Sequence, residues 1–171
     1  MKRAIVVVAL AVMCVVSVGS SVFAQDCGEG KPQIAIYMTG GKLLKEDKDV
    51  MRSMIADDLG KRNWFCVFER QGDFQKVLDK ELAKQQDGSI DVVNQKIYEA
   101  GKQVAAQYVF VGDVTSSSFG VVLTVRILNV ETAQQIASKT VKDFNAEQGE
   151  AKLKEAIDGM RKPVLNLLQK K

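Results

Sequence analysis

Residues 107–127 read QYVFVGDVTSSSFGVVLTVRI, and this stretch decides the class of fold. Its first part, residues 107–114, is apolar on both faces, as a strand covered on two sides must be. Ser116-Ser117-Ser118 is then expected to form a turn, after which polar Thr124 and Arg126 alternate with apolar residues. The apolar face of this second strand comprises Phe119, Val121, Leu123, Val125 and Ile127. A two-faced strand followed by a half-buried antiparallel strand predicts a mixed sheet.

The segment after this hairpin is predicted to form a polar edge strand and then a long helix. Residues 134–144 continue the strand pattern, but Lys139 and Lys142 make it polar. Two interpretations of these lysines stay open, because they could border an edge that accepts a partner strand or could prevent such pairing. Residues 145–148 match a capping box, and Pro163 is expected to kink or interrupt the helix near its end. The apolar stripe of this helix is Leu153, Ala156, Ile157, Met160, Val164 and Leu168.

Before the deciding stretch, strand and helix patterns alternate. Residues 33–38 are a β-prone run that ends at Thr39-Gly40-Gly41, and residues 47–62 have the apolar spacing of an amphipathic helix. Residues 64–68 are apolar on both faces, and two more helical patterns follow. Their apolar positions are Phe74, Val77, Leu78 and Leu82, then Ile90, Val93, Ile97, Ala100 and Val104. The order βαβααβββα predicts a single compact α/β (α+β) domain over residues 25–171, with a mixed parallel and antiparallel sheet and helices packed on it.

Residues 1–24 have the features of a cleaved signal peptide. Met1-Lys2-Arg3 is basic, residues 4–16 are apolar, and Val22-Phe23-Ala24 places small residues where signal peptidase requires them. Cleavage is therefore expected between Ala24 and Gln25, which leaves no membrane span in the processed chain. The apolar run is shorter than the roughly 20 residues that a membrane-spanning helix needs, so an uncleaved anchor is the weaker alternative. The expected location is the periplasm, with secretion or association with the outer membrane as alternatives.

Two cysteines, Cys27 and Cys66, remain after this cleavage in a compartment where disulfides persist. A bridge between them would close a loop of about 40 residues and stabilise the fold by about 4 kcal/mol in the chain-entropy model. The alternative is a pair of unpaired thiols, with Cys66 acting as a small buried strand residue.

The composition excludes several classes of chemistry. The chain has 24 Lys and Arg, 21 Asp and Glu, and no His, so it carries no Ser-His-Asp or Cys-His apparatus and no His-ligated metal. Its formal net charge of +3 and aromatic content of 6% give no indication of nucleic-acid binding. We therefore expect no cofactor, no metal and no nucleic-acid partner.

Two short motifs are candidate ligand sites. Gly40-Gly41-Lys42 follows a strand, but Leu43 stands where a phosphate-binding loop has Ser or Thr, so a plain turn is the preferred interpretation. Glu69 and Arg70 end a strand, where α/β sheets commonly bind ligands. Because nothing nearby supplies a second acid or a metal cluster, a salt bridge or a helix-capping contact is preferred over catalysis.

Four segments in order resemble the CsgG/LpoB/TolB amino-terminal family of bacterial envelope domains. They are the opening strand at residues 34–37, the FCVFER strand end at 65–70, GKQVAAQYVFVG at 101–112 and RILNVET at 126–132. The resemblance implies a non-enzymatic periplasmic protein that binds other envelope proteins. Ala133 replaces the glycine usual after the last segment, and the chain has neither a lipidated cysteine nor a following propeller.

The leading hypothesis is a soluble periplasmic protein-interaction module in envelope assembly or secretion, with envelope proteins as partners. Glu69, Arg70, Lys139 and Lys142 are the candidate interaction residues. The first alternative is a self-associating structural subunit, a homo-oligomer joined through the sheet edge or the last helix. The second is an enzyme or small-ligand-binding domain that uses the region around Glu69 and Arg70.

Overall fold

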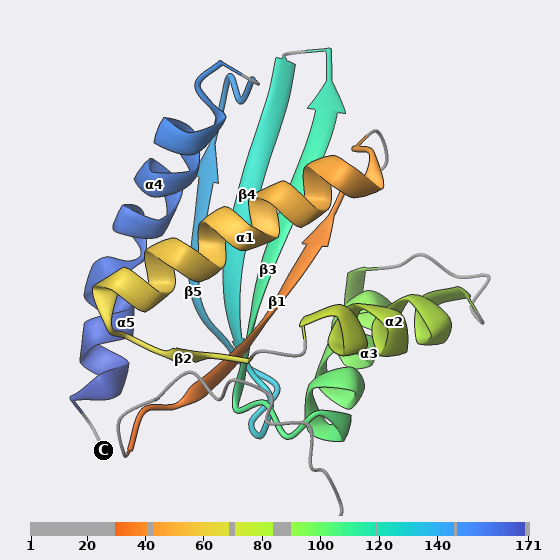
Figure 1. Ribbon diagram of the computed structural model, residues 1–171, viewed down its shortest axis with the longest axis vertical. Helices are drawn as coiled ribbons and strands as arrows, with labels where there is room; N and C mark the ends of the chain where they lie inside the picture. Colours follow the sequence, from red (N-terminus) through yellow and green to blue (C-terminus); the bar gives the residue numbers. More distant parts are fainter. Residues whose placement is uncertain are drawn as a thin grey trace, which may run out of the picture.

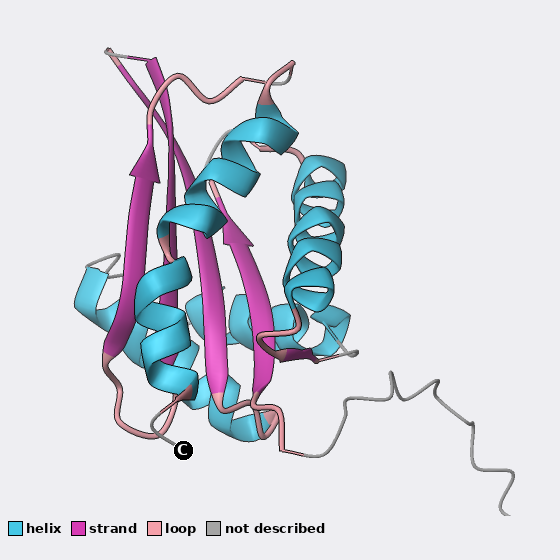
Figure 2. Cartoon of the chain, turned by 90° about the vertical axis from the view of Figure 1, so that its left-hand side faces the viewer, coloured by secondary structure: helices cyan, strands magenta, loops and turns pink. Residues whose placement is uncertain are grey.

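A five-stranded mixed sheet lies between two layers of helices (Figures 1 and 2). The computed structural model describes residues 30–40, 43–68, 71–83, 90–118, 120–145 and 147–169. The strands are β1 (Gln33–Thr39), β2 (Cys66–Val67), β3 (Tyr108–Ser117), β4 (Gly120–Asn129) and β5 (Gln135–Val141). The helices are α1 (Lys45–Arg62), α2 (Gln71–Ala83), α3 (Ile90–Gln103), α4 (Gly149–Gly159) and α5 (Arg161–Leu168). This arrangement confirms the predicted α+β class and the order of elements.

The strand order is β2-β1-β3-β4-β5, so the sheet is parallel on one side and antiparallel on the other. β1 pairs in parallel with both β2 and β3, while β3, β4 and β5 form an antiparallel meander. From β1 the chain crosses to the edge strand β2, and from β2 it crosses back past β1 to β3. Right-handed crossovers therefore place α1 on one face of the sheet and α2 and α3 on the other.

Alternate residues of β1 supply two separate cores. Ile34, Ile36 and Met38 belong to the core between the sheet and α1, α4 and α5, whereas Ala35 and Tyr37 belong to the core under α2 and α3. Fully burying each large side chain contributes about 1.5–3 kcal/mol. β1 packs against α1 on one face and α2 on the other, while α4 and α5 pack on β4 and β5. The two-faced apolar pattern of β1 and β3 follows directly from this double cover.

The hairpin between β3 and β4 is longer than the sequence predicted. Ser116 and Ser117 do not form the expected turn but pair with Val121 and Gly120. Polar residues can extend the ladder here because Ser116, Ser118 and Gly120 are exposed to solvent. Phe119, which was expected on the apolar face, lies outside the described residues.

The predicted strand at residues 64–68 is shorter than expected, since only Cys66 and Val67 pair with β1. Trp64 and Phe65 are nevertheless buried, because their side chains pack into the core beneath α1. Their apolar character therefore reflects burial and not membership of the ladder.

The long carboxy-terminal helix is interrupted, as Pro163 predicted, and forms α4 and α5. Pro163 has no N–H to donate to the carbonyl of Gly159, which is where α4 ends. The expected capping box is only half formed. The Asn145 side-chain oxygen accepts the Gln148 N–H at 2.8 Å, but the helix itself begins at Gly149.

Candidate functional site

A groove of about 610 Å³ opens between α1 and α4 at one end of the sheet. Figure 1 shows the two helices approaching each other at the carboxyl end of α1 and diverging toward its amino end, with β3 and β4 behind them. We call this feature the α1–α4 groove. Its lining residues are Leu43, Asp47, Val50, Met51, Met54, Val114, Val121, Phe144, Asn145, Glu147, Gly149, Glu150 and Leu153.

The apolar stripe of α1 is wider than the sheet beneath it can cover, and this excess forms one wall of the groove. Met51, Ile55 and Leu59 are spaced by one turn and are buried against the sheet. Val50 and Met54 form a second row, one position earlier around the helix, and both line the groove. Met54 is half-buried, but the Val50 side chain is 59% exposed.

The floor and the opposite wall come from three distant segments. Val114 and Val121 lie near the free end of the β3–β4 hairpin, Phe144 follows β5, and Leu153 projects from α4. The Phe144 N–H donates to the Val121 carbonyl at 2.9 Å, which holds the chain after β5 against the hairpin. The floor is therefore apolar and fixed by backbone hydrogen bonding.

The rim of the groove is acidic. Asp47, Glu147 and Glu150 line it, and no Lys or Arg is among its lining residues. Asp47 accepts a hydrogen bond from the backbone N–H of Leu44 at 3.3 Å, as a residue in the first turn of a helix does. Glu150 pairs with Lys154 at 2.6 Å, and this hydrogen bond lowers the pKa of Glu150 below its ordinary value. All three carboxylates are exposed to solvent, so the rim carries negative charge at neutral pH.

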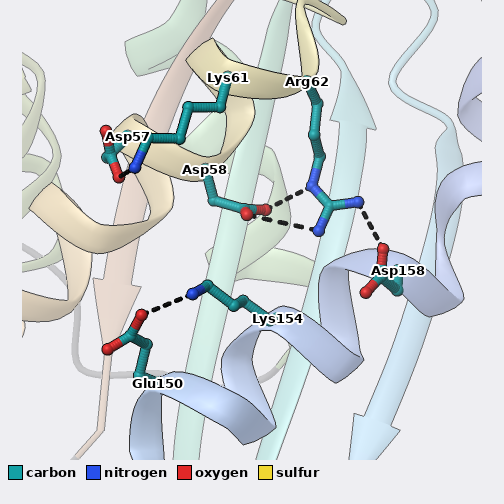
Figure 3. A network of polar contacts seen from close by, with 7 residues as sticks. All are labelled: Asp57, Asp58, Lys61, Arg62, Glu150, Lys154 and Asp158. Atoms are coloured by element: carbon teal, nitrogen blue, oxygen red, sulfur yellow. Dashed lines mark hydrogen bonds and ion pairs between the residues drawn. The ribbon is translucent and has the colours of Figure 1, made fainter.

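Charged side chains gather where α1 and α4 approach each other, and one ion pair, Arg62 with Asp158, joins the two helices (Figure 3). Arg62 of α1 donates to Asp58 on the same helix and to Asp158 on α4, and its guanidinium lies 5.1 Å from the ring centre of Trp64. The pKa of Lys154 is raised by its bond to Glu150 and further by the charges of Asp57 and Asp58. Opposite charges thus face each other where the two helices approach.

Most residues predicted as functional lie outside the described residues. Ala24, Gln25, Cys27, Glu69 and Arg70 belong to this group. The proposed cleavage, the disulfide and the strand-end role therefore stay predictions. The other member of the predicted disulfide, Cys66, is a buried residue of β2.

Lys139 and Lys142 lie at the exposed edge strand, apart from the lining of the α1–α4 groove. A methyl group built on Gly159 would lie 2.8 Å from the Lys139 Cδ, so the lysine stem packs on the end of α4. Lys139 therefore covers a helix with its aliphatic carbons while its ammonium group reaches solvent. Lys142 follows β5 and is exposed. The choice between accepting and preventing strand pairing stays open.

Sequence reasoning missed the groove. The amphipathic spacing of residues 47–62 does not separate Val50 and Met54 from the buried row, although a stripe that includes both rows is broader than one buried face requires. That breadth, followed by the acidic Glu147 and Glu150 where α4 begins, was the only available signal. It could not show that the two segments meet.

A second polar cluster lies on the other face of the sheet, where β3 and β4 extend past α2 and α3. Arg126 donates to the Asn94 side-chain oxygen at 3.3 Å, while its Nε is buried without a hydrogen-bond partner. Burial raises the pKa of Asp113, and the nearby positive charge of Arg126 partly offsets this shift.

Within the described ranges, no three His, Cys, Asp or Glu side chains gather in a way that could hold a metal ion. The helices in the same ranges are too short or too polar to cross a membrane.

Comparisons with known proteins find only distant similarity to solved structures. No protein-family model matches the sequence, and no curated protein matches it significantly. Among solved structures, the LpoB carboxy-terminal domain from Salmonella enterica is 15% identical, with a TM-score of 0.45, over 66% of this chain and 81% of that one.

Two further solved structures have comparable scores. TolB from Acinetobacter baumannii is 13% identical, with a TM-score of 0.45, over 77% of this chain and 28% of that one. A PelC dodecamer from Paraburkholderia phytofirmans is 12% identical, with a TM-score of 0.43, over 80% of this chain and 90% of that one. At these identities and scores, the similarity assigns neither a family nor a function to this chain.

Proposed function

We propose that this chain is a non-enzymatic protein-interaction module of the bacterial cell envelope, and that the α1–α4 groove is the surface that holds its partner. The observation that carries the proposal is where the structure leaves apolar side chains exposed. Among the described residues, the exposed large apolar side chains are Leu44 and Val50, at 67% and 59%. Val50 lines the groove, and Leu44 adjoins Leu43, which also lines it.

Exposure of this kind has a cost that the fold itself does not recover. Each Å² of apolar surface left in water forgoes about 25 cal/mol of stabilisation. Single exposed apolar side chains are common, but these two are continuous with an apolar cavity that is partly buried. A partner that covers Leu44 and Val50 and fills the groove would gain this free energy on binding.

The envelope location is part of the same proposal and rests on the sequence. The basic, apolar and small-residue regions of residues 1–24 favour export, and the four-segment resemblance favours a protein that works with other envelope proteins. Mass spectrometry of the protein purified from the periplasm tests export, since the expected mature chain begins at Gln25. A cytosolic protein with an intact amino terminus would contradict it.

Site-specific photocrosslinking in the source cells tests the partner surface. A photoreactive amino acid at Val50 is expected to crosslink to an envelope protein, whereas the same group at Lys80, an exposed residue of α2 on the other face of the sheet, is not. The Val50→Asp variant should lose the partner in affinity purification while keeping its circular dichroism spectrum. Equal adducts at both positions, or none at Val50, would refute the proposed function.

A further inference from the structure

We infer that the α1–α4 groove binds a basic amphipathic helix, that is, a helical segment of a partner protein with Lys or Arg beside an apolar stripe. This inference rests on the proposed function, because it names the kind of partner that the groove takes.

The floor selects apolar side chains. Met51, Val114 and Leu153 are buried at its base and offer no charged group to an incoming side chain. The volume of about 610 Å³ lies within the range of about 300–1,000 Å³ over which proteins hold ligands, so the groove can accept more than one apolar group. A partner held there must therefore present an apolar stripe.

The rim selects positive charge. Three carboxylates line the groove, and among the described residues only Glu150 has a basic partner, Lys154. The amino ends of α1 and α4 both lie at the groove, and their helix dipoles together offset about one further negative charge. Negative charge is left after both corrections, and within the described residues no ion pair involves Glu147 or Asp47. An anionic ligand would be repelled at this rim, whereas Lys or Arg would be attracted.

The walls favour a helix over an extended peptide. Both walls are helices, whose backbone groups are bonded internally except at their ends. An extended peptide would find no strand edge there and would bury unpaired N–H and C=O groups. A helix satisfies its own backbone and needs only side-chain contacts, which is how amphipathic helices dock into apolar grooves.

A second copy of this chain does not supply a suitable helix. Among the described helices, the basic amphipathic one is α5, with Arg161 and Lys162 at its start. Its apolar side chains Val164, Leu165 and Leu167 already pack against the core of their own molecule. Binding a second groove would require α5 to leave that core, so a partner of different sequence is the occupant.

Fluorescence anisotropy with synthetic peptides tests the inference on the full processed protein. The probe is a labelled Leu/Lys amphipathic helix of about 18 residues, long enough to form a helix, and the matched control replaces every Lys with Glu. The Lys peptide is expected to bind and the Glu peptide is not. Raising the salt concentration should weaken the binding, because the attraction at an exposed rim is screened.

Variants assign the binding to the groove. Glu147→Lys should raise the Kd for the Lys peptide about fivefold or more. Val50→Asn, which removes apolar surface without adding charge, should raise it about threefold or more. Glu131→Lys is the matched control, since Glu131 is an exposed carboxylate beyond the far end of β4. Equal effects of the Glu147 and Glu131 substitutions, or equal binding of the two peptides, would overturn the inference.

The remaining outcomes separate this inference from the proposed function. Crosslinking at Val50 without any binding of the Lys peptide would mean that the groove holds a partner of another chemistry, so only the inference would fail. Self-association abolished by Val50→Asp would identify a second copy as the occupant and would also overturn it. Binding to anionic lipid vesicles that depends on Val50 would identify a lipid surface as the occupant, and this result would also overturn the inference. If the photoreactive group at Val50 captures nothing in cells, the proposed function fails whatever the peptides do.

Discussion

Replacing Arg62 with alanine should destabilise the protein by about 2 kcal/mol, because one guanidinium ties together three side chains at the carboxyl end of α1. Arg62 and Asp58 are only 19% and 14% exposed, and the Arg62 Nε lies 2.5 Å from a carboxylate oxygen of Asp58. Hydrogen bonds to charged groups contribute about 1.5–3 kcal/mol. Stacking over Trp64 adds about 0.5–1 kcal/mol, and the pair with the 59% exposed Asp158 adds less than about 1 kcal/mol.

These contributions are not additive, since Asp58 is near enough to the surface to recover part of its hydration once Arg62 is removed. The net value of about 2 kcal/mol corresponds to a fall of about 1 M in the midpoint of urea unfolding. Arg62→Lys should lie between the two proteins, because lysine keeps the charge but cannot bond to Asp58 and Asp158 with a planar group.

Urea unfolding followed by tryptophan fluorescence and circular dichroism measures this effect. Lys61→Ala is the matched control, because Lys61 is adjacent in sequence and pairs with Asp57, but both side chains are largely exposed. Its effect should stay within about 0.5 kcal/mol. A double-mutant cycle should give a larger coupling energy for Arg62 with Asp58 than for Arg62 with Asp158. If Arg62→Ala is no more destabilising than Lys61→Ala, or if the Asp158 coupling dominates, the reasoning about burial is wrong.

Three further predictions concern stability. Because burial raises the pKa of Asp113, folding disfavours the charged form of this carboxyl group. Asp113→Asn should therefore stabilise the protein at pH 7, and this advantage should be lost once the pH is below about 4, where Asp113 is protonated in both the folded and the unfolded chain. Thermal melts across pH check this, and destabilisation at pH 7 would contradict it. Gly112→Val should lower the free energy of unfolding by about 1–3 kcal/mol, because a Cβ at Gly112 would lie 2.4 Å from the Met38 sulfur. Adding Met38→Ala to this variant should recover part of the loss in a thermal melt. An unchanged melting temperature of Gly112→Val would count against the close approach. If Cys27 and Cys66 are bridged, reduction should lower the free energy of unfolding by about 2–4 kcal/mol. A thiol titration of the unfolded, unreduced protein should then find no reactive thiol from this pair, and two reactive thiols would exclude the bridge.

The fold was largely predictable because its elements have local signatures. The alternation after Ser118 indicated a half-buried strand, and Leu123, Val125 and Ile127 indeed lie buried on one face of β4. Pro163 indicated the break between α4 and α5, since a missing N–H acts at a known position in a helix. The prediction failed where pairing overrode composition, as at Ser116 and Ser117, which continue the ladder in place of a turn.

The sequence by itself determined which residues are apolar, on which period they recur and therefore which elements form and which faces they bury. Only the tertiary structure decided that Val50 and Met54 would be left over beside the buried row of α1. Their surroundings come from β4, the segment after β5 and α4, more than 60 residues away in the chain. Periodicity is a local property of the chain, whereas a groove depends on the angle between two helices. That angle depends on how the two helices pack on a shared sheet, which residues far apart in the chain determine together.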